Sequence, residues 1–195
     1  MDVKKYLQLL QPSFRFLLPT GIIFLSALFF GIYTALTNTE ATTEALDELG
    51  QFASFFMNLS SWQLMLVIMV NNVLKSFVAL IGGLLFGIPP FMYLLINGNI
   101  LGLLSAHLVA TGTPLTEVLI LLVPHGIIEL AGFLLASSYG FFLGFRMYRR
   151  IQYKDLLRPH VHQALRAFVY IIAPLLIVAS LVEAFITPHL LPLVV

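Results

Sequence analysis

Residues 118–145 read VLILLVPHGIIELAGFLLASSYGFFLGF, and Glu129 is the sole Asp, Glu, Lys or Arg among them. A transmembrane helix needs about 20 consecutive, mainly apolar residues, so this stretch predicts a helix that crosses a bilayer. The surrounding region has the same character, because Ser60 to Phe145 contains only three charged residues, Lys75, Glu117 and Glu129. Such a long region with so little charge predicts several crossings.

The composition of the whole chain indicates one integral membrane domain over residues 1–195. Hydrophobic residues make up 59% of the chain and charged residues 10%, and the mean hydropathy is +0.98. Soluble domains have about 45–50% apolar and about 25% charged residues, so a soluble globular protein and a disordered chain are excluded. The net charge of +1 gives no reason to expect a nucleic-acid partner. The chain has no Cys, which excludes disulfides and thiolate metal sites.

The distribution of charge predicts the number and direction of the crossings. The segment 38–61 has four acids and no base, whereas six bases lie in 146–166 and three precede the first apolar run. Basic loops remain in the cytoplasm. We therefore expect a cytoplasmic N-terminus, an extracytoplasmic acidic loop at 38–61 and a cytoplasmic basic loop at 146–166. An odd number of crossings must separate these two loops, which gives five in total and places the C-terminus outside.

The predicted fold is an all-α polytopic bundle in the cell membrane with about five crossings. They are placed at 16–37, 64–88, 90–111, 125–145 and 167–187. A signal peptide is the alternative for the first, but its apolar run is long and lacks a small-x-small cleavage site. The turn between the second and third helices is placed at 88–90, with 97–99 as the alternative. Residues 115–123 form an extra apolar piece, separated from the fourth helix by a break at Pro124.

Polar residues inside these crossings are candidates for a functional site, because such residues usually face protein or a water-filled cavity. Glu129 and His125 are one helical turn apart on the same face. Around the helix axis, Glu129 also lies on the same side as a series of small residues. Such residues mark close helix packing, so we expect Glu129 to face protein. This small-residue ridge is Gly132, Ala136, Gly140 and Gly144. The predicted buried polar site contains Asn71, Asn72, Lys75, Asn97, His125 and Glu129.

Lys75 and Glu129 are expected to form an ion pair within this site. Counted from the inner ends of their helices at 1.5 Å per residue, Lys75 lies about 20 Å and Glu129 about 25 Å from the cytoplasmic boundary. Both therefore fall in the outer half of the membrane, and His125 and Asn72 would complete a pocket open to the outside. The alternative is that the pair only holds the two helices together, since a buried ion pair does not by itself indicate a functional site.

A divalent metal held by His125 and Glu129 is a further alternative. Zinc hydrolases use three protein ligands and a water molecule. Only these two residues stand at ligand spacing, and the HExxH pattern is absent. We assign no catalytic residue and no cofactor, and an enzyme is not the favoured interpretation.

The order and spacing of the motifs in residues 65–146 resemble the stage II sporulation protein M family. The motifs are Asn71-Asn72, Gly82-Gly83, Gly87, Asn97-Gly98, Gly102 and Pro124-His125-Gly126 with Glu129. The resemblance implies an integral membrane protein of about five helices. In spore-forming bacteria such proteins act with partners that remodel peptidoglycan during engulfment. The family motifs support the assignment of the following residues to a site: Asn71, Asn72, Gly98, His125 and Glu129.

Three functions are consistent with these features. The favoured one is a non-enzymatic membrane scaffold that self-associates as a homodimer and recruits other membrane proteins. The first alternative is a transporter or channel subunit that uses the polar pocket for a small solute or ion, because broken membrane helices line cavities. The second is a metal-assisted intramembrane hydrolase.

The predicted orientation can be tested by cysteine accessibility, since the chain has no native Cys. Glu44→Cys should react with an impermeant maleimide in intact cells, and Lys154→Cys should react only after the membrane is permeabilised. The reverse pattern would show that the orientation is wrong.

Overall fold

The computed structural model describes residues 3–55 and 59–187, and every regular element in them is helical. The helices are α1 (Val3–Thr37), α2 (Thr39–Ser54), α3 (Ser61–Gly82), α4 (Ile88–Ala110), α5 (Leu115–Tyr153), α6 (Arg158–Ala167) and α7 (Ala173–Phe185). A π-helical segment, Phe168–Ile172, joins α6 to α7 without a loop. Five helical stretches are long and apolar enough to cross a membrane, at 6–37, 61–82, 88–110, 126–153 and 158–185. The predicted fold class is therefore confirmed.

The turn between the second and third crossings lies at 83–87, next to the predicted position at 88–90. Gly87 has φ +80°, a left-handed conformation that residues with a Cβ atom rarely adopt. Pro89 and Pro90 stand in the first turn of α4, where proline is tolerated. The alternative turn at 97–99 is wrong, because those residues lie within α4.

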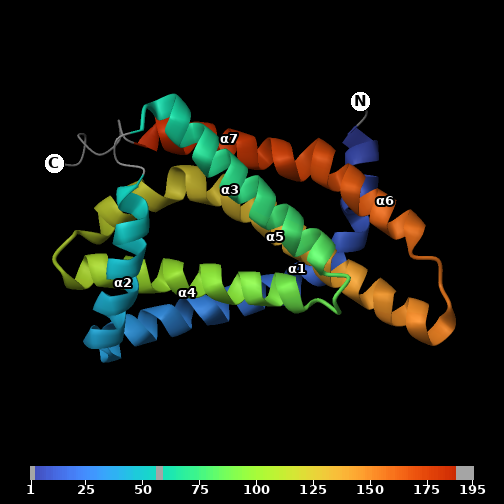
Figure 1. Ribbon diagram of the computed structural model, residues 1–195, viewed down its shortest axis with the longest axis horizontal. Coiled ribbons are helices and arrows are strands. Elements are labelled where there is room, and N and C mark those ends of the chain that lie inside the picture. Colours follow the sequence, from blue (N-terminus) through green and yellow to red (C-terminus); the bar gives the residue numbers. More distant parts are fainter. Residues whose placement is uncertain (1–2, 56–58, 188–195) are drawn as a thin grey trace.

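The predicted break at Pro124 is absent, because α5 continues through this residue. Residues 115–123 are accordingly the first turns of α5 and not a separate piece. In Figure 1 these first turns run at an angle to the rest of α5. Proline removes one backbone hydrogen bond and bends a helix, and membrane helices tolerate this where neighbours satisfy the freed groups.

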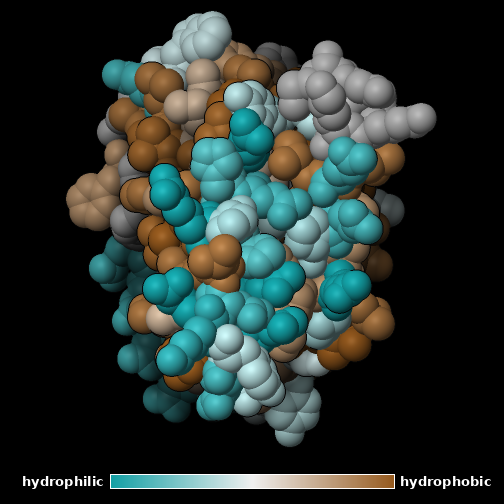
Figure 2. All heavy atoms as spheres, turned by 90° about the vertical axis from the view of Figure 1, so that its right-hand side faces the viewer, coloured by the Kyte–Doolittle hydropathy of each residue, from teal (hydrophilic) through white to brown (hydrophobic). Residues whose placement is uncertain are grey.

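The two charged segments that connect the predicted crossings are mostly helical. The acidic segment forms α2, which packs across α1 and α4 (Figure 1). In the basic segment, α5 continues to Tyr153 and α6 starts at Arg158, so only 154–157 form a loop. Arg149 pairs with Asp155 at 2.8 Å (Nε to Oδ2) and stabilises this loop. Hydrophilic side chains gather at this end of the molecule (Figure 2).

Glycine contacts between backbones determine how closely the helices pack. A Cβ atom at Gly83 would lie 2.0 Å from the carbonyl oxygen of Gly140, and one at Gly144 would lie 2.7 Å from the amide nitrogen of Gly87. Gly132 is covered by the side chain of Leu176 in α7. The small-residue ridge of α5 therefore packs against α3, α4 and α7 of its own chain.

The helices form two groups that separate toward one end of the bundle. One group is α1 with α4, which contact each other along much of their length; the other is α3, α5 and α7. In Figure 1 the groups meet near the α3–α4 turn and diverge toward the end where α4 leads into α5. This divergence positions the candidate site.

The Gly83–Gly140 contact predicts a steric effect on stability. Gly83→Ala should lower the free energy of unfolding in detergent by about 1–3 kcal/mol, the usual cost of overpacking. Gly21→Ala is the matched control, because Gly21 lies within α1 and a Cβ there meets nothing within 4 Å. Equal melting temperatures for the two variants would contradict the close contact between α3 and α5.

Candidate ligand-binding cavity

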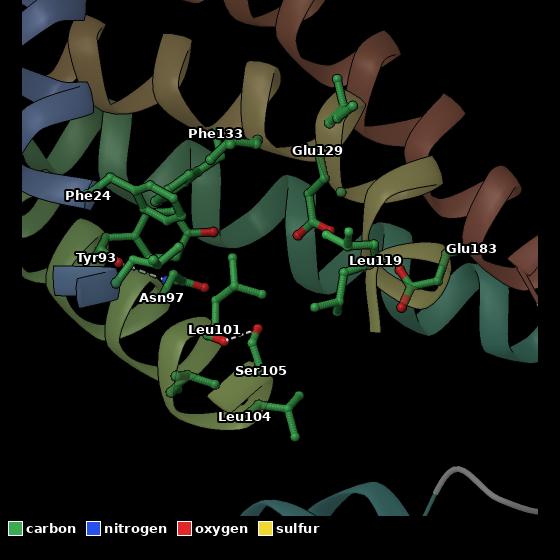
Figure 3. Close-up of a pocket in the computed structure, with 16 residues that line it drawn as sticks. Phe24, Tyr93, Asn97, Leu101, Leu104, Ser105, Leu119, Glu129, Phe133 and Glu183 are labelled. Carbon is green, nitrogen blue, oxygen red and sulfur yellow. Dashed lines mark hydrogen bonds between the residues drawn. The ribbon is translucent and has the colours of Figure 1, made fainter. Parts of the chain in front are cut away.

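A cavity of about 590 Å³ lies between α1, α4, α5 and α7, where the two helix groups diverge. Most of its lining is apolar and consists of leucine, isoleucine and phenylalanine side chains. Five residues with polar side chains also line it (Figure 3): Tyr93, Asn97, Ser105, Glu129 and Glu183. Ligand sites in membrane bundles have this character, with a few polar groups in an apolar concavity.

Two carboxylates face this cavity from different helices. Glu129 is on α5, just beyond the bend at Pro124, and its carboxylate points into the cavity (Figure 3). Glu183 is in the last turn of α7 and lines the same space. Both carboxyl groups are therefore available to a positively charged group inside the cavity.

The polar groups of α4 complete one side of the cavity. The Asn97 amide donates from Nδ2 to the carbonyl oxygen of Tyr93 at 2.8 Å. This bond orients the amide, and its own oxygen points into the cavity (Figure 3). The Ser105 hydroxyl donates to the carbonyl oxygen of Leu101 at 2.6 Å. The cavity therefore presents oxygen atoms to a ligand at several positions.

The structure brings together only part of the predicted polar site. Glu129 and Asn97 line the cavity, whereas Asn71 and Lys75 are exposed on α3. Asn72 is buried and accepts a hydrogen bond from the Asn71 side chain at 3.3 Å. The remaining family-motif residue, Gly98, has a packing role, since a Cβ there would lie 2.7 Å from the carbonyl oxygen of Phe24 in α1.

The predicted ion pair between Lys75 and Glu129 is not formed. Both ion pairs found among the described residues involve Asp155, at the basic end of the bundle. The reason is the rotation of α3: its buried face is centred on Asn72, Ser76 and Ala79, so Lys75 lies on the flank of this face. Residue counts along each helix predict depth, but they do not predict how α3 is rotated about its own axis.

The metal hypothesis stays a prediction, because the side chain of His125 lies outside the described part of the structure. Among the side chains that are described, no three His, Cys, Asp or Glu residues are grouped so that they could hold a metal ion.

Glu183 is the site residue that the sequence analysis missed. It was an ionisable residue inside the predicted crossing 167–187, which is the signal that could have identified it. Spacing along one helix, however, does not show which residues of another helix it faces. Glu183 reaches the cavity because α7 packs along α5, for example where Leu176 lies against Gly132.

Comparison with known proteins agrees with the resemblance in the motifs. The model of the stage II sporulation protein M family matches residues 20–188. An uncharacterized protein of Methanocaldococcus jannaschii is 29% identical over 126 residues, which are 63% of this chain and 70% of that protein. No solved structure is significantly similar. Because the family model spans most of the sequence, the chain belongs to the stage II sporulation protein M family of multi-span membrane proteins.

Proposed function

We propose that this protein binds a small, positively charged solute in the cavity and acts as a transporter or channel subunit. The observation that carries the proposal is the presence of two carboxylates, Glu129 and Glu183, facing one cavity among membrane-spanning helices. Ionisable groups in such positions are costly and mark the paths of substrates or ions.

The absence of the Lys75–Glu129 ion pair favours this function over a purely structural role. A purely structural ion pair would place the Lys75 ammonium against the Glu129 carboxylate, and no such contact is formed. Glu129 instead lines a cavity together with a second carboxyl group, that of Glu183. A cationic ligand in this cavity would supply the partner of opposite charge that Lys75 does not provide.

The packing at the two ends of the cavity supports access from one side. Leu119 and Ile127 line the cavity and are 49% and 64% exposed, so it opens at the surface of the bundle. At the other end of the bundle, the α3–α4 turn packs closely on α5 through the Gly83–Gly140 contact. In the orientation that the charges predict, the open end belongs to the outer half of the membrane.

A scaffold is the second candidate function, and the exposed polar residues of α3 favour it. Asn71 and Lys75 lie on the surface of a helix that crosses the membrane, where a partner helix would shield them from lipid. The partner helix would belong to a second copy of the chain or to another membrane protein. Since the ridge of α5 packs within its own chain, a homodimer would have to use other surfaces such as this one. A strictly monomeric mass in lipid nanodiscs would count against it.

Accessibility of the cavity can be tested with one serine that lines it and one serine in the packed core. Ser105→Cys should react with a small cationic methanethiosulfonate reagent roughly tenfold faster than with an anionic one. An attraction of about 1.4 kcal/mol between the cationic reagent and the acidic cavity gives that ratio. Ser137→Cys should be inert, because Ser137 is fully buried in packed core. Equal reactivity of the two variants would show that the cavity is not open.

Cation binding can be tested by thermal stability of the purified protein with chloride salts of Na⁺, Mg²⁺, tetramethylammonium and hexyltrimethylammonium. At about 100 times its Kd, a ligand stabilises the folded state by about 2.7 kcal/mol. At least one of these cations should raise the Tm of the wild type but not of Glu129→Gln. Glu117→Gln is the matched control, since Glu117 is on the same helix but does not line the cavity.

A cation that binds should then be taken up by liposomes that contain the wild-type protein. If no cation raises the Tm in a way that depends on Glu129, the proposed function is wrong. If a cation binds without being taken up, the cavity serves binding alone.

A further inference from the structure

The lining of the cavity indicates the chemical class of its ligand. We propose, resting on the function proposed above, that the ligand is an organic ammonium with an apolar group attached, and not a bare metal ion. The oxygen atoms, the aromatic rings and the aliphatic surface of the cavity each support this ligand class.

The oxygen atoms are not grouped as an inorganic cation requires, and the space is large. Ca²⁺ takes six to eight oxygen ligands at about 2.3–2.6 Å, and Mg²⁺ requires near-octahedral geometry. The cavity offers two carboxylates, the amide oxygen of Asn97 and the hydroxyl oxygens of Tyr93 and Ser105, and no three acidic or histidine side chains among the described residues come together as a metal site. These groups are distributed around about 590 Å³, a volume suited to a molecule of several carbon atoms.

Aromatic rings form one wall beside Glu129. Phe133 lies one helical turn beyond Glu129 on α5, and it makes edge-to-face contacts with Phe24 of α1 and Tyr93 of α4. The ring centroids are 5.8 Å and 4.6 Å apart. All three rings line the cavity and lie together at one side of it (Figure 3). Aromatic rings beside a carboxylate favour alkylated ammonium groups, through cation–π attraction and contact with the alkyl carbons.

Aliphatic side chains line the rest of the cavity and extend to its opening. Leu101, Leu104 and Leu130 line its interior, and the exposed Ile127 stands at its rim. A polar solute such as a hydrated ion gains nothing from this surface. An alkyl chain gains about 0.8 kcal/mol for each CH₂ group that it buries, so the cavity favours an ammonium with an apolar tail. The apolar rim is suited to a ligand that enters from the bilayer.

The test compares probes that separate charge from apolar surface. Hexyltrimethylammonium has a cation and a tail, tetramethylammonium has the cation alone, and hexanesulfonate has the tail with a negative charge. Their apparent Kd values are measured from the concentration dependence of the Tm of the intact protein, with MgCl₂ and NaCl alongside. Hexyltrimethylammonium should bind at least roughly tenfold more tightly than tetramethylammonium, because burial of a few CH₂ groups gives that ratio. Hexanesulfonate should not bind.

Variants locate the binding in the cavity. Glu129→Gln should abolish the response to hexyltrimethylammonium, whereas Glu117→Gln should retain it. Phe133→Leu should weaken binding severalfold, and Phe133→Tyr should restore it, because a ring is kept. If Phe133→Leu does not fold, Tyr93→Leu removes another ring of the same wall and replaces it in the comparison.

The outcomes separate the ligand class from the proposed function. If Na⁺ or Mg²⁺ stabilises the protein in a Glu129-dependent way and hexyltrimethylammonium does not, the ligand class is wrong while cation binding stands. If no cation has a Glu129-dependent effect, both proposals fail. Equal responses of Phe133→Leu and wild type would overturn the role of the aromatic wall, and a response to hexanesulfonate would show that the tail alone binds.

Discussion

The close packing of glycine backbones at one end of the bundle is the constraint on which the rest of the structure depends. Gly83 and Gly87 of the α3–α4 turn contact Gly140 and Gly144 of α5 so closely that a side chain at Gly83, Gly140 or Gly144 would collide with backbone. Helices associate in membranes largely through such packing, because lipid provides no hydrophobic drive for their association. With one end fixed in this way, the two helix groups separate toward the other end and leave the cavity between them.

The cavity in turn explains how two carboxylates are accommodated within a membrane bundle. A charged side chain exposed to hydrocarbon is costly, and Glu129 and Glu183 avoid that cost by facing a common space inside the protein. Ion pairing with Lys75, the expected solution, is not used. The apolar and aromatic lining around the two acids favours ligands that carry an apolar group, which charge alone would not do. We therefore propose that the ligand of this cavity is an organic cation.

The sequence was sufficient for the fold because the signals for crossings are long and local. Runs such as residues 118–145 predict helices by length alone, and the prolines Pro89 and Pro90 locate the inner turn. The continuity of α5 through Pro124 was not predictable, because it depends on neighbouring helices that satisfy the freed backbone groups. The site was predicted in part: Glu129 and Asn97 line the cavity, but the rotation of α3 and the meeting of Glu183 with α5 are set by tertiary packing.

The most direct test of the central claim, that Glu129 and Glu183 together receive a cation, is an infrared difference spectrum of the protein in the carboxyl region. It would be recorded with and without hexyltrimethylammonium, for the wild type, both single Gln variants and the double variant. The account predicts a carboxyl band that changes on addition of the cation, that is reduced in each single variant and that is lost in the double variant. An unchanged difference spectrum in the double variant would contradict it.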